Sequence, residues 1–92
     1  MLISNALVTV ENPNRYINRL CKHWAHKFEV EQSELAGTID FGHALCALTA
    51  ADNELKLHLK SNQPEELDKM QQVVANHLIG MSNQNIVNVT WE

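Results

Sequence analysis

The sequence predicts an α+β protein in which two helices cover one face of a mostly antiparallel sheet. Two segments carry apolar residues at the three-and-four spacing of an amphipathic helix. The other segments alternate apolar and polar residues with the period of two that is typical of half-buried strands. The order of these patterns is β-α-β-β-β-β-α-β, and a two-layer sandwich is the simplest way to bury every apolar face. A chain of 92 residues holds one modest core, so we expect a single domain spanning residues 1–92.

The first predicted strand covers residues 2–10, with Ala6, Val8 and Val10 on one face. Asn12 and Pro13 then predict the start of a helix, because Asn is a good N-cap and Pro suits the first helical turn. We expect this helix to continue to about residue 27. Its inner stripe consists of Ile17, Leu20, Cys21, Trp24 and Phe28.

Four short strands are expected next, over residues 28–32, 37–41, 44–50 and 54–60. The last of them has the clearest alternation, because Leu55, Leu57 and Leu59 alternate with Lys56, His58 and Lys60. Gly42 and the pair Asp52-Asn53 are the expected turns between strands.

A second helix is predicted to begin at Pro64, followed by Glu65 and Glu66, where acidic side chains favour a helix start. Gly80 is expected near its end. The inner stripe of this helix consists of Leu67, Met70, Val74, His77, Leu78 and Met81. A last strand is expected over residues 85–91, with Val87, Val89 and Trp91 on one face. The uncovered sheet face would then carry Lys56, His58, Lys60, Asn88 and Thr90, and would face water or a partner.

Composition excludes several classes of protein. Seven Lys and Arg stand against eleven Asp and Glu, a balance that argues against a nucleic-acid binder. No apolar run approaches the ~20 residues of a membrane span, and the N-terminus lacks the pattern of a signal peptide. Two distant cysteines, Cys21 and Cys46, do not form a disulfide framework. We therefore expect a cytoplasmic protein with no membrane or nucleic-acid partner.

The densest chemistry lies in residues 20–28, where Cys21, His23 and His26 suggest zinc or iron ligands. On a helix, His23 and His26 lie about 60° apart, whereas Cys21 points to the opposite side. Cys21 is therefore expected in the core. His77 lies on the other helix and on the same side of the sheet, so the candidate metal set is His23, His26 and His77. The alternatives are that His77 packs in the core and that the protein has no cofactor.

Cationic side chains form a stripe on the first helix, since Arg15, Arg19, Lys22 and His26 recur at spacings of four, three and four. Such a stripe is either a solvated helix face or a docking surface for an anion. The candidate ligand-binding residues are Arg19, Lys22, His23 and His26, and the expected ligand is a small anion.

Nucleophilic catalysis has little support in the sequence. We find no nucleophile elbow, phosphate-binding loop or dinucleotide fingerprint. Both cysteines are expected in the core, where a thiol is unreactive. A binding role is therefore favoured over an enzymatic one, and no catalytic residue is assigned.

Six motifs together resemble a bacterial family known as domain of unknown function 2218. They are Arg15-Tyr16, the block from Leu20 to Lys27, Gly37-x-Ile39-x-Phe41, Leu55-x-Leu57-x-Leu59, the run from Val73 to Leu78, and Val89-x-Trp91. The resemblance implies a link to iron acquisition, because some relatives are associated with siderophore-interacting flavin reductases. The element order is also similar to the β-α-β4-α arrangement of TATA-binding-protein-like folds.

We therefore expect a non-enzymatic accessory or binding domain, linked by the resemblance to iron–siderophore metabolism. Its partner would be a small anionic ligand or a protein of the siderophore-reductase type. Two alternatives stay open. One is a small enzyme that uses its imidazoles for metal-assisted or acid–base chemistry, and the other is a structural module that forms a homodimer through the uncovered sheet face.

Overall fold

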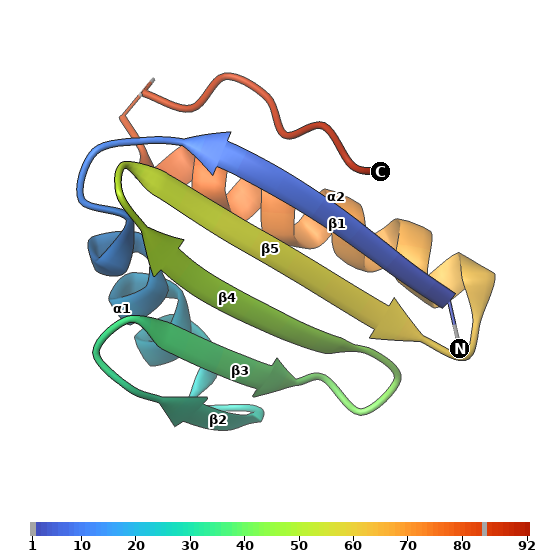
Figure 1. The fold of residues 1–92 in the computed structure, drawn as a ribbon. Coiled ribbons are helices and arrows are strands. Elements are labelled where there is room, and N and C mark those ends of the chain that lie inside the picture. Colours follow the sequence, from blue (N-terminus) through green and yellow to red (C-terminus); the bar gives the residue numbers. More distant parts are fainter. Residues whose placement is uncertain (1, 84) are drawn as a thin grey trace.

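The computed structural model describes residues 2–83 and 85–92, and over these residues the chain forms five strands and two helices (Figure 1). Their order confirms the predicted succession as far as the second helix. The elements are β1 (Leu2–Thr9), α1 (Pro13–Trp24), β2 (Glu29–Gln32), β3 (Ala36–Asp40), β4 (Leu45–Ala51), β5 (Glu54–Ser61) and α2 (Pro64–Met81).

The strands form one antiparallel sheet in the order β1-β5-β4-β3-β2. Both helices lie on the same side of it, so the predicted two-layer α+β architecture is confirmed (Figure 1). The β-α-β4-α element order matches the predicted resemblance to TATA-binding-protein-like folds. Among the residues that the structure describes, no helix covers the other side of the sheet, which we call the open face.

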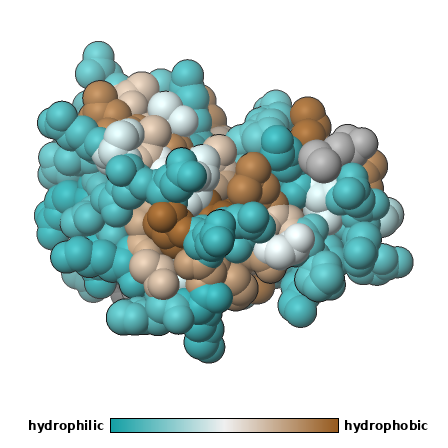
Figure 2. Space-filling view, turned by 90° about the horizontal axis from the view of Figure 1, so that it is seen from below, coloured by the Kyte–Doolittle hydropathy of each residue, from teal (hydrophilic) through white to brown (hydrophobic). Residues whose placement is uncertain are grey.

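The core lies between the sheet and the helices. Leu55, Leu57 and Leu59 are fully buried, whereas Lys56 between them is exposed, as the alternation predicted. From α1, Ile17 and Leu20 complete this layer. Burying each such aliphatic side chain contributes about 1.5–3 kcal/mol, so these alternating residues account for the position of both layers. In the space-filling view, hydrophobic surface gathers in a central hollow framed by polar side chains (Figure 2).

The ends of both helices differ in detail from the prediction. Asn12 occupies the N-cap position of α1, but its side chain makes no capping bond and its backbone is left-handed, with φ of 54°. Asn tolerates this conformation better than most residues, which explains its place there. α1 ends at Trp24, one turn earlier than expected. Gly80 lies inside α2, which is closed instead by the backbone N–H of Ser82 donating to the carbonyls of Leu78 and Ile79.

The predicted last strand is the main correction. Residues 85–92 form neither helix nor strand. Ile86 rather than Val87 enters the core, and Val87 is 77% exposed. The segment returns along the outer edge of β1, where Asn5 and Glu92 exchange two backbone hydrogen bonds of 3.1 and 2.8 Å (Figure 1). Asn88 and Thr90 therefore lie outside the sheet and do not belong to its open face.

Among the described residues, no helix is both long enough and apolar enough to span a membrane.

Candidate functional site

A groove of about 770 Å³ lies between α1 and α2, at the level of the C-terminal half of each helix. The amphipathic stripes place it there, because the side chains just outside each buried stripe face one another across the helix pair. Arg19, Lys22, His23 and His26 line it from α1 and the turn that follows α1. Asn76, His77, Gly80 and Met81 line it from α2.

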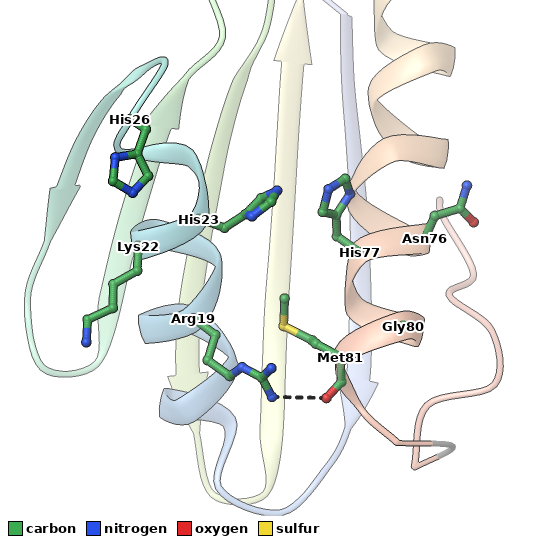
Figure 3. A pocket seen from close by; sticks show the side chains of 8 residues that line it. All are labelled: Arg19, Lys22, His23, His26, Asn76, His77, Gly80 and Met81. Atoms are coloured by element: carbon green, nitrogen blue, oxygen red, sulfur yellow. Dashed lines mark hydrogen bonds between the residues drawn. The ribbon is translucent and has the colours of Figure 1, made fainter.

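Two imidazoles meet in this groove. His23 and His77 point toward one another from the two helices, with ring centroids 4.9 Å apart and planes tilted by 50° (Figure 3). Trp24 contacts both, with its ring 5.6 Å from His23 and 4.8 Å from His77. The two rings thus bring polar nitrogen atoms from both helices to the same part of the groove.

A backbone hydrogen bond fixes the ring of His77. Its Nδ1 lies 2.7 Å from the carbonyl oxygen of Val73, one turn earlier on α2, and its N–H donates a hydrogen bond to that oxygen. In the neutral ring, Nε2 is then the unprotonated nitrogen and is left to accept a proton or a hydrogen bond. His77 is half-buried rather than part of the core, so this nitrogen is within reach of a ligand.

Arg19 connects the two helices. Its Nη1 donates a 3.2 Å hydrogen bond to the carbonyl oxygen of Met81, at the C-terminal end of α2 (Figure 3). A cation is favoured at that end, because the last carbonyls of a helix lack intrahelical partners and carry partial negative charge. The bond occupies one of the five N–H donors of the guanidinium group. Donors therefore remain for an anion in the groove.

The structure divides the four candidate ligand-binding residues into two pairs. Arg19 and His23 point into the space between the helices, whereas Lys22 and His26 point away from α2 (Figure 3). All four line the groove, but only the first pair faces His77. Asn76, Gly80 and Met81 were not predicted as site residues from the sequence. Gly80 and Met81 follow His77 by three and four residues, and this helical spacing was the available signal.

The three imidazoles proposed as metal ligands do not converge. His23 and His77 are neighbours, but His26 points to the other side of α1 (Figure 3). Within residues 2–83 and 85–92 there is no group of three or more His, Cys, Asp or Glu side chains placed to hold a metal ion. His23 and His77 alone could supply two imidazole nitrogens, fewer than a protein-held zinc requires.

The groove has a positive character in an acidic chain. The net charge of the protein is −4. The eight lining residues in the described part of the chain include no Asp or Glu, and Arg19 and Lys22 supply two permanent positive charges. This local excess of cations favours an anionic ligand over a cationic one.

The cysteines lie apart from this chemistry. Cys21 and Cys46 are buried free thiols, as expected for Cys21 from its position on α1. Burial raises the pKa of both thiols. A buried neutral thiol is a poor nucleophile, so neither residue is a candidate for covalent catalysis.

Comparison with known proteins agrees with this fold. The structure is similar to the NMR structure of PA4090 from Pseudomonas aeruginosa, with a TM-score of 0.87 and 43% sequence identity over 100% of this chain and 96% of that one. No curated protein matches the chain. Residues 5–92 match the family described as "Uncharacterized protein conserved in bacteria (DUF2218)". Because this match covers nearly the whole chain, the protein belongs to that family of uncharacterised bacterial proteins.

Proposed function

We propose that the protein is a cytoplasmic, non-enzymatic binding module that takes a small anionic ligand in the groove between α1 and α2. The observation that carries this proposal is the meeting of His23 and His77 at 4.9 Å in a groove that Arg19 also lines. Nitrogen-bearing side chains from two helices thus line one groove without an acidic neighbour in the lining. The guanidinium group donates charge-assisted hydrogen bonds, which are about twice as strong as neutral ones, and Nε2 of His77 donates to an anion when it carries a proton.

The first test is a titration with inorganic phosphate and with citrate, followed by amide NMR shifts and calorimetry. We expect shifts centred on residues 19–26 and 76–81. Arg19→Gln removes the permanent charge nearest the imidazoles and should weaken citrate binding at least tenfold, because a charged hydrogen bond contributes about 1.5–3 kcal/mol.

Lys56→Gln is the matched control, since it removes one charge from an exposed position on the open sheet face. This variant should bind citrate with an affinity within about twofold of the wild-type value, because only the net charge of the protein changes. Equal losses in the two variants, or no binding by the wild-type chain, would contradict the proposal. Thermal melts of both variants separate lost binding from lost structure, because Arg19 also bonds the end of α2.

The place of this module in iron–siderophore metabolism is part of the same proposal, and the family resemblance supports it. Ferric citrate is the direct probe, with iron-free citrate as its comparison. If the ligand is an iron chelate, ferric citrate should bind more tightly than iron-free citrate. Titration with a siderophore-interacting flavin reductase tests whether such a protein is the partner. Tighter binding of iron-free citrate and no response to the reductase would remove the iron assignment and leave the anion groove.

A second candidate role is self-association through the open sheet face, and a pattern of charges favours it. Asp40, Leu45 and Lys60 lie side by side on neighbouring strands β3, β4 and β5 of this face. A twofold axis along β4 would bring Leu45 against the Leu45 of a second copy and Lys60 against the second copy's Asp40. On β1, Ile3 and Leu7 extend the apolar surface, at 56% and 55% exposed.

Sedimentation equilibrium with single and double charge reversals tests this interface. Lys60→Glu and Asp40→Lys should each weaken the dimer, because each places like charges together. The double variant should restore it. A wild-type chain that sediments as a monomer at millimolar concentration, or a double variant no better than the singles, would contradict self-association through this face.

A further inference from the structure

A second hollow lies beside the anion groove, and its walls are aromatic. It has a volume of about 280 Å³ and lies between the C-terminal end of α1, the turn from β3 to β4, and the N-terminal half of α2. The ring of Phe41 makes edge-to-face contacts with Trp24 at 5.1 Å and with Phe28 at 4.9 Å. Four of the five aromatic ring contacts in the described residues include Trp24 or His77, so this cluster is concentrated at the seam between the helices.

The remaining wall is also apolar. α2 contributes Met70 and Val73, and the start of β4 is preceded by the buried Ala44. On the face that Figure 2 shows, hydrophobic surface gathers in a central hollow. An apolar cavity of about 150 Å³ is large enough to bind benzene, so the aromatic hollow has room for one ring and a short side arm.

The aromatic hollow and the anion groove share a boundary. Trp24 lines the hollow and contacts His77, whose ring lines the groove, at a centroid distance of 4.8 Å and a tilt of 49°. On α2, Val73 of the hollow and His77 of the groove are four residues apart, which is about 6 Å along the helix axis. A small molecule that lay along the seam between the two helices would contact both places.

We infer that the ligand of this protein is an aryl carboxylate, whose ring enters the aromatic hollow and whose carboxylate lies against His23, His77 and Arg19. This inference rests on the proposed anion groove and assigns the chemical class of its ligand. The rim of the hollow carries Glu66 as well as Lys69, so it adds no net charge. The hollow thus selects the ring, and the groove selects the acid.

The rise of about 6 Å from Val73 to His77 along α2 guides the choice of probe length. A ring joined directly to its carboxyl group is shorter than this distance, whereas two intervening methylene groups span it. 3-Phenylpropionate is therefore the appropriate probe. Propionate supplies the acid without the ring, and benzyl alcohol supplies the ring without the acid.

The experiment is calorimetric titration of the full chain with these three probes. We expect 3-phenylpropionate to bind at least tenfold more tightly than propionate or benzyl alcohol. Phe28→Ala and Val73→Thr alter the hollow and leave the groove intact. Each should weaken the binding of 3-phenylpropionate at least fivefold and leave the affinity for propionate unchanged. Val87→Thr makes the same change at an exposed valine as Val73→Thr and should have no effect.

The outcomes separate this inference from the proposed function. Equal affinities for 3-phenylpropionate and propionate would overturn the aryl assignment while the anion groove stands. An aryl acid that binds no better than benzyl alcohol would overturn it too, because the carboxylate would then contribute nothing. Absence of binding by phosphate, citrate and propionate alike would overturn the groove itself. Val73→Thr changes the side-chain volume less than Phe28→Ala does. If Phe28→Ala fails to fold, Val73→Thr therefore still tests the inference.

Discussion

At the scale of single residues, chemistry-bearing side chains separate into core and surface along α1. Cys21 is buried, whereas His23 is exposed only two positions later. The helical repeat was sufficient to predict this division, because it fixes the angle between neighbouring side chains. It does not fix which neighbouring element a surface side chain faces. Lys22 and His26 were therefore grouped with Arg19 and His23, although only the latter two face α2.

Cys46 gives a prediction about alkaline stability. Burial, and to a smaller extent the neighbouring Cys21, raise the pKa of its thiol from the ordinary value of 9.0 to about 12. Above pH 9 the unfolded chain loses this proton and the folded chain retains it. The free energy of unfolding should therefore fall as the pH rises from about 9 to about 12, with a slope approaching about 1.4 kcal/mol per pH unit.

Urea unfolding at a series of alkaline pH values measures this slope. Cys46→Ala is the comparison, because it removes the thiol and keeps the other titrating groups. The variant should start from a lower stability, since it leaves a small cavity, and should lose less stability with rising pH. Parallel curves for the two proteins would show that Cys46 does not titrate as expected.

At the scale of elements, the close approach of α1 to β3 depends on Gly37. A Cβ atom at this position would lie 2.7 Å from the Sγ of Cys21 and 3.1 Å from the side chain of Ile17. Both contacts are shorter than a buried core tolerates without rearrangement. The missing side chain thus sets how deeply α1 packs, and with it the height of His23 over the sheet.

Gly37→Ala should accordingly destabilise the protein by about 1–3 kcal/mol, the typical cost of overpacking a core. Gly80→Ala is the matched control, because a Cβ there meets nothing within 4 Å and the residue lies inside α2. That substitution should stabilise the protein by about 0.5–1 kcal/mol through helix propensity. Thermal and urea unfolding of both variants measures the two changes in the free energy of unfolding. Equal changes in the two variants would rule out the proposed packing contact at Gly37.

The C-terminal segment shows where the reasoning about elements failed. Alternating Val87, Val89 and Trp91 predicted a strand, but a strand needs a partner along its whole length. The segment meets β1 in a single pair of backbone bonds, at Asn5 and Glu92. Ile86 is instead anchored by the buried Ser82, whose Oγ accepts a 3.0 Å hydrogen bond from the N–H of Ile86. Local alternation contains no information about such an anchor.

At the scale of the whole molecule, hydrophobic periodicity was enough to predict the two-layer architecture, because both helices and four of the five described strands have one buried face and the layers follow from pairing those faces. The site was predicted only in part. The anion groove draws on two helices and included residues already named from their charge. The aromatic hollow draws on α1, α2 and the turn after β3, and residues such as Trp24 and Met70 were interpreted as core. Only tertiary structure brings these segments together.

The pairing of β1 with β5 has a consequence for how the chain is made. Leu2 pairs with Ser61 and Thr9 with Glu54, so β1 is synthesised well before its partner strand exists. Loop closure over this distance is entropically costly and slows folding relative to the local hairpins of β2 to β5. During that interval Ile3 and Leu7 belong to an unpaired, apolar N-terminal segment. Synthesis, rather than the finished fold, is therefore the stage at which this protein is most exposed to misassociation.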